Sequence, residues 1–192
     1  MFENPLYYVI AIPQLIILGW YFYKLWQKKQ LRQKQKEVIN KEYPYEGLRN
    51  MALNSMPGAI IANVPHGEVF VYGVLMDWDM GDDMVTLAAQ ITGEANLYVK
   101  SGGGFIGAGR HIAVSEAAQA FVRSSHSFLQ YAFPATATPL PGKNCIKFYF
   151  LTNNGKYAAT DDVKNMDGRA SQLLPLFEGA RALIAEMSRQ GS

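Results

Sequence analysis

The N-terminal part of the chain contains an apolar run that ends at a basic stretch. Residues 6–23 (LYYVIAIPQLIILGWYFY) include no Asp, Glu, Lys, Arg or His across 18 positions. At about 1.5 Å per residue, a helix of this length spans roughly 27 Å, close to the thickness of a bilayer's hydrocarbon core. Tyr and Trp side chains gather at both ends of the run, where amphipathic rings prefer the membrane interface. The pattern predicts a single transmembrane helix, which we place within residues 1–26.

The main alternative to an anchor is a cleavable signal peptide. A signal peptide carries basic residues before its apolar core and small residues at a cleavage site after it. Here Glu3 is the only charged side chain before the run, and bulky aromatic residues follow it. A buried core helix would show polar residues at helical intervals, and this run has almost none. Both alternatives fit the residues less well than an anchor does.

A basic stretch follows the apolar run and contains no acidic residue before Glu37. Its six basic residues are Lys24, Lys28, Lys29, Arg32, Lys34 and Lys36. Basic residues beside a span favour the cytoplasmic side, and near the surface each contributes about 1 kcal/mol of attraction to anionic lipid headgroups. We therefore expect the N-terminus outside the membrane and the rest of the chain in the cytoplasm. Residues 27–44, polar and rich in helix formers, are predicted to form a helical stalk.

The remaining residues, 45–192, are enough for one folded domain. Residues 38–192 carry 12 Lys and Arg against 14 Asp and Glu, so this part lacks the basic face that nucleic-acid binding requires. Cys145 is the only cysteine, which excludes an intramolecular disulfide. We therefore predict a cytoplasmic domain with no nucleic-acid partner.

The apolar pattern of residues 45–192 alternates between the strand period and the helix period. Helices are expected at 46–54, 110–130 and 170–189, and strands at 69–76, 84–91, 95–100, 145–151 and 156–159. Short turns between neighbouring strands require antiparallel pairing. The sequence thus predicts an α+β fold with a five-stranded, mainly antiparallel sheet and packed helices.

The predicted order of elements, α-β-β-β-α-β-β-α, resembles that of profilin-like and roadblock/longin-like domains, many of which act as small adaptors or sensors. Only the order of elements carries this resemblance. The stretch MDWDMGDDMVTLAAQITGEANLYVKSGGGFIGAGRH, with ATPLPG further along the chain, resembles a family of bacterial membrane-anchored proteins. The second resemblance implies a bacterial inner membrane for the anchor and implies no activity.

Glycines cluster between the third predicted strand and the helix that follows it. Three of them match G-x-G-x-x-G, and an arginine and a histidine come next; the candidate ligand-binding residues are Gly102, Gly104, Gly107, Arg110 and His111. Such glycines let backbone N–H groups approach a phosphate, and a helix N-terminus adds partial positive charge. The other marks of a dinucleotide fold are absent, because the strand belongs to a hairpin and no acidic residue follows about 20 positions on. The alternative for the loop 102–109 is a structural connection.

Four acidic residues lie close together after the first predicted strand. They are Asp77, Asp79, Asp82 and Asp83. Carboxylates at this density are candidate ligands for Ca²⁺ or Mg²⁺, although their spacing differs from that of an EF-hand loop. Asp and Gly also favour turns after a strand, which is the alternative interpretation.

No catalytic signature is present, since G-x-S-x-G, H-E-x-x-H and C-x-x-C are all absent. Within the apolar run, Gln14 suggests contact with another membrane helix. We therefore predict a single-pass protein without a cofactor, whose domain acts as a protein-binding adaptor or a membrane-complex subunit. The alternative is a small-molecule binding domain or an enzyme that uses the glycine-rich loop.

Overall fold

The structure is a computed structural model that describes residue 27, residues 44–56, residue 58 and residues 67–190. The chain divides into two compact units, Met1–Glu42 and Tyr43–Ser192, and the description below concerns the second. The predicted anchor, the six basic residues and nearly all of the predicted stalk lie outside the described residues. Within the described segments, no helix combines the length and the apolar character that a membrane span needs.

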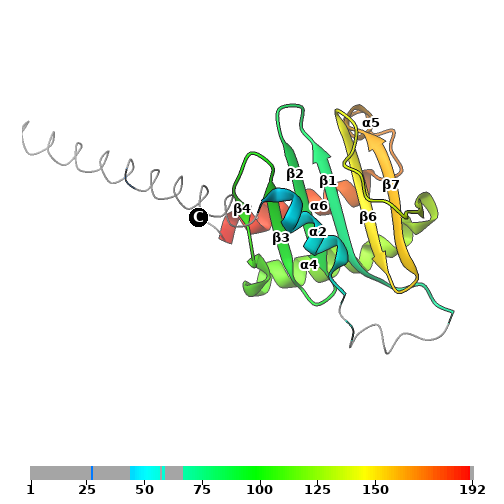
Figure 1. Cartoon of the computed structure of the whole chain (residues 1–192), viewed down its shortest axis with the longest axis horizontal. Helices are drawn as coiled ribbons and strands as arrows, with labels where there is room; N and C mark the ends of the chain where they lie inside the picture. The colour runs from blue at the N-terminus through cyan, green and yellow to red at the C-terminus, as the bar shows by residue number, and fades with distance from the viewer. Residues whose placement is uncertain (1–26, 28–43, 57, 59–66, 191–192) are drawn as a thin grey trace, which may run out of the picture. The chain divides into compact units, whose positions relative to one another are not determined.

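An antiparallel sheet forms the centre of the domain (Figure 1). Its strands are β1 (Val71–Asp79), β2 (Met84–Gln90), β3 (Ala95–Val99), β4 (Gly104–Phe105), β5 (Phe133–Pro134), β6 (Cys145–Thr152) and β7 (Gly155–Asp162). They lie in the order β4-β3-β2-β1-β6-β7-β5, and each neighbouring pair is antiparallel. This arrangement confirms the predicted α+β class and the antiparallel pairing.

The sheet has seven strands, so the predicted number of five is wrong. The two additional strands, β4 and β5, have two residues each and form the two edges. A strand of two residues has no apolar alternation that a sequence pattern can reveal. Very short edge strands, here containing Gly104 and Pro134, also limit pairing with the edge of another chain.

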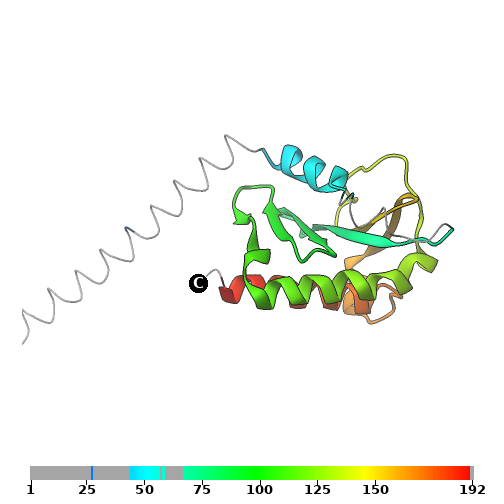
Figure 2. The same ribbon diagram turned by 90° about the horizontal axis from the view of Figure 1, so that it is seen from below.

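Helices cover both faces of the sheet, and Figure 2 shows the three layers. On one face lie α4 (Ile112–Ser125) and α6 (Leu174–Gln190), and on the other lies α2 (Tyr45–Asn54). The shorter helical segments are η1 (Ala108–Arg110), η2 (His126–Tyr131) and α5 (Val163–Asp167). The helix predicted at 110–130 is therefore an α-helix followed by a tighter 3₁₀ segment, a common way for a helix to end.

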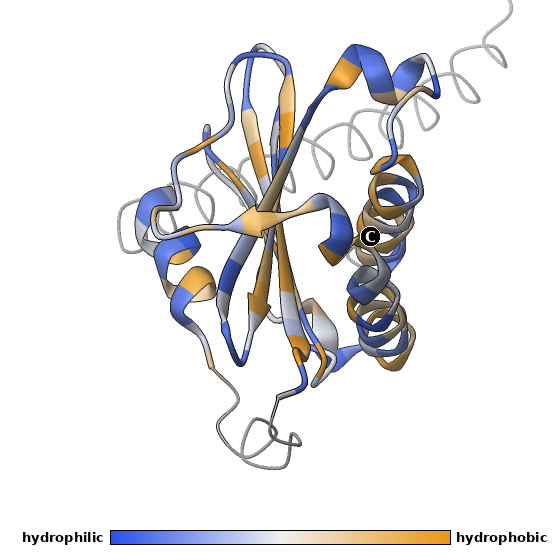
Figure 3. Ribbon diagram, turned by 90° about the vertical axis from the view of Figure 1, so that its right-hand side faces the viewer, coloured by the Kyte–Doolittle hydropathy of each residue, from blue (hydrophilic) through white to orange (hydrophobic). Residues whose placement is uncertain are grey.

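The larger apolar core lies between the sheet and the α4–α6 pair. Figure 3 shows the sheet between its two helical layers, with hydrophobic residues, in orange, along the strands. The last predicted helix, expected at 170–189, is observed as α6, and its buried residues, which recur at helical spacing, are Leu176, Phe177, Ala180, Leu183 and Met187. A smaller cluster, with Leu75 and Tyr149 at its centre, lies under α2. The two cores leave the sheet buried on both faces at its middle strands.

Candidate functional site

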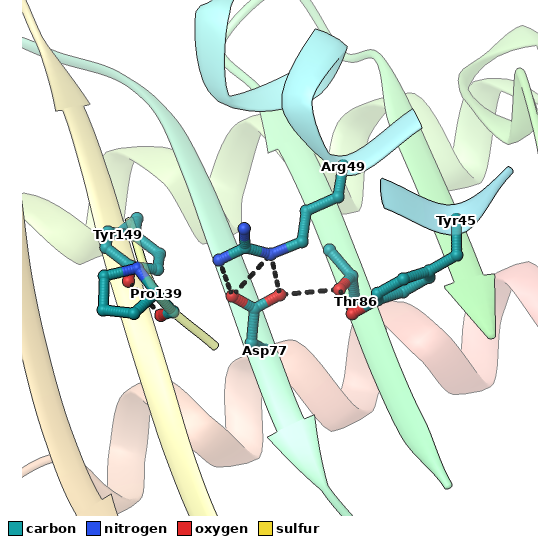
Figure 4. Close-up of polar contacts among 6 residues, drawn as sticks. All are labelled: Tyr45, Arg49, Asp77, Thr86, Pro139 and Tyr149. Atoms are coloured by element: carbon teal, nitrogen blue, oxygen red, sulfur yellow. Dashed lines mark hydrogen bonds and ion pairs between the residues drawn. The ribbon is translucent and has the colours of Figure 1, made fainter. Parts of the chain in front are cut away.

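A buried ion pair joins α2 to the middle of the sheet (Figure 4). The Arg49 guanidinium donates from Nε to both carboxylate oxygens of Asp77, at 3.1 and 3.0 Å, and from Nη2 to Oδ2 at 2.6 Å. Arg49 is 6% exposed and Asp77 is 0% exposed. Two buried charges need this kind of forked, well-aligned pairing, because neither is solvated by water.

Two hydroxyl groups extend the ion pair toward the N-terminus of α2. Thr86 lies opposite Asp77 in the β1–β2 ladder, and its hydroxyl donates to Asp77 Oδ1 at 2.6 Å. Because that donation uses the only proton of the Thr86 hydroxyl, the Tyr45 hydroxyl, 2.6 Å away, donates to Thr86 Oγ1. Burial raises the pKa of Tyr45 to about 12. The phenol therefore stays protonated at neutral pH.

The position of Asp77 corrects its assignment to an acidic turn. The sequence places residues 77–79 after the first strand, whereas β1 continues to Asp79. The carboxylate of Asp77 is consequently buried under α2 and engaged by Arg49 and Thr86. We conclude that it anchors α2 and is not available to a metal ion.

The other three carboxylates of the predicted cation site line a hollow of about 400 Å³ at the β1–β2 turn. Asp79 accepts hydrogen bonds from the backbone N–H groups of Gly81 and Asn144, at 3.0 and 2.9 Å. In the part of the chain that the structure describes, no group of three or more His, Cys, Asp or Glu side chains could hold a metal ion. The geometry favours the alternative interpretation, in which these carboxylates shape a turn.

Asp83 shows the same use of a carboxylate as a turn acceptor. It accepts from the backbone N–H groups of Met84 and Ser101, at 2.8 and 3.1 Å, and from the Ser101 hydroxyl. Burial raises the pKa of Asp83, but these hydrogen bonds and the charge of Lys100 outweigh burial and hold the pKa below its ordinary value. The carboxylate is therefore ionised and ties the β1–β2 turn to the end of β3.

The first part of the glycine-rich loop forms a tight β3–β4 hairpin. Gly102 N–H donates to the Val99 carbonyl at 2.9 Å, and Val99 N–H donates to the Gly103 carbonyl at 3.1 Å. Gly104 has a φ of +131°, and a Cβ there would lie 1.9 Å from the Leu97 carbonyl oxygen. These positions need glycine for the turn and for the close approach of two strands.

Replacing Gly104 by Ala is expected to destabilise the domain by about 1–3 kcal/mol, because the methyl group forces the strands apart and φ is strained. The measurement is the free energy of unfolding from urea titration. The matched control is Gly155→Ala, since Gly155 also has a positive φ, of +99°, but open space around its Cβ position. Equal losses in the two variants would contradict a steric requirement at Gly104.

The second part of the loop borders a hollow of about 430 Å³. The hollow is lined by Glu94, Asn96, Ile106, Gly107, Gly109 and Arg110. Gly107 N–H donates to Asn96 Oδ1 at 2.7 Å, and Arg110 Nε donates to the Gly107 carbonyl at 3.2 Å. Of the five predicted ligand-binding residues, the structure therefore brings Gly107 and Arg110 together at this hollow.

The other three predicted residues do not line the hollow. Gly102 and Gly104 belong to the hairpin described above, and His111 is the exposed N-cap residue of α4. The hollow carries charges of both signs, because Glu94 and Arg110 both contribute to its lining. It is a mixed polar and apolar surface with an acidic side chain, whereas the sequence pattern predicts glycine N–H groups, Arg110 and His111 around a phosphate.

Two exposed isoleucines lie in the segment that contains this hollow's residues 106–110 and the start of α4, and the sequence interpretation missed both. Ile106 lines it and is 49% exposed, and Ile112, at the first position of α4, is 77% exposed. A signal was available for Ile112, because the buried stripe of α4 begins at Val114 and leaves it on another face. Nothing in the sequence separates Ile106 from a core residue.

The buried pair under α2 was also missed, although α2 carries a signal for it. Tyr45, Arg49 and Leu53 are spaced four residues apart, which places them on one face of a helix. That face is the one that α2 buries. A charged side chain in the middle of an otherwise apolar face predicts a buried partner, which here is Asp77.

Comparison of the chain with known proteins gives no match. No family model, no curated protein and no solved structure matches it. The resemblances in element order and in the 76–111 stretch accordingly stay predictions.

Proposed function

We propose that this protein is a single-pass membrane-anchored adaptor or membrane-complex subunit whose domain binds another protein beside η1. The observation that carries the proposal is the exposure of two isoleucines close together in the chain: Ile106 lines the hollow and is 49% exposed, and Ile112 begins α4 and is 77% exposed. Exposed apolar side chains that are rimmed by charged groups are typical of protein interaction sites. Glu94 and Arg110 supply that rim here.

A protein partner suits this hollow better than a phosphate group does. The carboxylate of Glu94 contributes to the lining, and Arg110 Nε already donates to the Gly107 carbonyl. A phosphate bound here would lie near a like charge and would share the arginine with a backbone carbonyl. The phosphate- or nucleotide-binding alternative stays a prediction, with Arg110 as its one remaining cation at the hollow.

The membrane part of the proposal rests on the sequence. The apolar run within residues 1–26 supports one span, and the basic residues between 24 and 36 support a cytoplasmic domain near anionic lipid. An inner-membrane location would place the hollow beside η1 within reach of other membrane-bound proteins. Gln14, within the run, adds a candidate contact inside the membrane.

The test is affinity purification of the full chain from membranes in a mild detergent. We expect the wild-type protein to recover a partner in stoichiometric amount, and the variant with Ile106→Asp and Ile112→Asp to lose it. Aspartate is compatible with the first turn of a helix, so Ile112→Asp should leave α4 intact. The matched control is Phe133→Asp, which changes a side chain that is 76% exposed on β5, at the opposite edge of the sheet.

Two results would contradict the proposal. One is recovery of the wild-type chain without a partner, and the other is a partner that the double isoleucine variant still retains. Stabilisation of the wild-type protein by nucleotides in a thermal-shift assay, abolished by Arg110→Ala, would instead favour the small-molecule alternative.

A further inference from the structure

We propose that α2 can detach from the sheet while the rest of the domain stays folded. When it does, Asp77 exchanges Arg49 for Lys147 as its counter-ion. Asp77 has two basic side chains near it: Arg49, on α2, and Lys147, on β6. When α2 leaves, Arg49 leaves with it, whereas Lys147 stays with the sheet. This arrangement gives the sheet a way to keep Asp77 paired in both states.

The register of the sheet places Lys147 beside Asp77. The two residues lie opposite each other in the β1–β6 ladder, as Thr86 does on the β2 side. Side chains opposite each other in antiparallel strands have Cβ atoms about 4.5–5.5 Å apart, well within the reach of a lysine. Lys147 is half-buried and forms no ion pair with any carboxylate among the described residues. Lys147 is thus a basic side chain next to the Asp77 carboxylate, which is already paired with Arg49.

Arg49 and Lys147 also share one aromatic ring. The Arg49 Cζ atom lies 5.6 Å from the centroid of the Tyr149 ring, and the Lys147 Nζ atom lies 5.3 Å from it. The Tyr149 hydroxyl donates to the Pro139 carbonyl at 2.5 Å, which holds the ring in place (Figure 4). Two like charges on one ring compete, and the forked guanidinium takes the carboxylate while the flexible ammonium remains nearby.

The rest of the contact between α2 and the sheet is small. The helix buries Tyr45, Arg49 and Leu53 and packs Leu48 and Ala52 against the smaller cluster in part, and its N-cap residue, Pro44, makes no side-chain hydrogen bond. The larger core lies on the opposite face of the sheet, between the strands and the α4–α6 pair. An element with few buried side chains is the kind that opens locally while the rest of the fold stays intact.

The position of α2 in the chain indicates what its detachment from the sheet could do. α2 begins at Tyr45, directly after the predicted stalk at residues 27–44, so any displacement of the N-terminal segment reaches α2 before the sheet. Release would lengthen the chain between the anchor and the sheet, and Lys147 would keep Asp77 paired meanwhile. This detachment of α2 is independent of the protein-binding function proposed for the hollow beside η1.

The first measurement is hydrogen exchange, followed by mass spectrometry, on the full chain in detergent micelles. In Arg49→Gln we expect the amides of α2 to exchange at least about tenfold faster, while those of β6 keep their wild-type protection. Arg49→Lys, which keeps the charge and loses the fork, should give an intermediate rate and serves as the milder variant. Unchanged protection of α2 in both variants, or equal loss of protection in α2 and β6, would overturn the proposal.

The second measurement is a double-mutant cycle on the melting temperature. Lys147→Gln alone should change Tm by less than about 2 °C, because Arg49 holds Asp77. In the Arg49→Gln background the same change should lower Tm by at least about 5 °C, because Asp77 then has neither cation. The matched control is Lys164→Gln, since Lys164 pairs with Asp162 at 3.5 Å and not with α2, so its effect should be additive with that of Arg49→Gln. Additive effects of Lys147→Gln and Arg49→Gln would refute the exchange of counter-ions.

Discussion

Asp77→Ala is expected to lower the free energy of unfolding by about 3–5 kcal/mol, the cost of leaving a buried charge without its partner. The substitution strands the Arg49 guanidinium under α2 and removes the acceptor of the Thr86 hydroxyl. Both groups are buried, so water does not replace the lost carboxylate. The measurement is urea-induced unfolding of the full chain in micelles, followed by tryptophan fluorescence.

Two comparisons make this prediction specific to the buried pair. Replacing both partners with apolar residues of similar size, Asp77→Leu with Arg49→Met, should cost less than Asp77→Ala alone, because no unpaired charge remains. The surface control is Asp162→Ala, which removes an exposed ion pair with Lys164 at 3.5 Å and should cost less than about 1 kcal/mol. A loss in Asp77→Ala no larger than that of the surface control would contradict the importance of the buried pair.

Stability is expected to fall steeply between pH 10 and pH 12, because three tyrosines have pKa values raised to about 12. Burial is the main cause for Tyr45, Tyr98 and Tyr149; the charge of Glu94 adds to it for Tyr98, and Arg49 partly opposes it for Tyr149. The ordinary tyrosine pKa is about 10, so above pH 10 the unfolded chain loses these protons before the folded chain does. Their stabilising contribution is therefore complete below pH 10 and is lost as the pH approaches 12.

Each of the three tyrosines lowers the stability by up to about 1.4 kcal/mol per pH unit in that range, which amounts to up to about 3 kcal/mol for each of them. The measurement is the free energy of unfolding from pH 8 to pH 12, together with the ultraviolet absorbance of tyrosinate. Tyr98→Phe should reduce the slope, because Tyr98 is 6% exposed and is one of the three titrating groups. A stability that stays level to pH 12, or a slope that Tyr98→Phe leaves unchanged, would contradict the assignment.

Several features of the fold were predictable because they depend on neighbours in the chain. The buried face of α6 and the strands β2, β3 and β6 follow from the spacing of apolar residues along each segment. The Asn154-Gly155 turn between β6 and β7 follows from the positive φ that Gly155 adopts. The two-residue edge strands were not predictable, because hydrogen bonds to a neighbouring strand define them and their own sequence pattern does not.

The candidate site was predictable only in part, for the same reason. The glycine pattern located the loop, but its glycines meet the steric demands of a hairpin, and the hollow depends equally on Glu94 and Asn96 of the preceding hairpin. The acidic cluster is contiguous in sequence, yet the alternation of β1 directs Asp77 to α2 and its ion pair. The residue types indicated which side chains could form a site, and the geometry of the strands decided which of these side chains lie close together.

By itself, the sequence determined the order of the longer helices and strands, the antiparallel pairing and the charge asymmetry between the N-terminal segment and the domain. These depend on residue type and on spacing along the chain, which a sequence displays directly. Only the tertiary structure decided that Arg49 pairs with Asp77, that Lys147 lies beside that pair, and that Ile106 is left exposed at a hollow. Such contacts join residues far apart in the chain, and they form only when packing fixes the register of each strand and the placement of each helix.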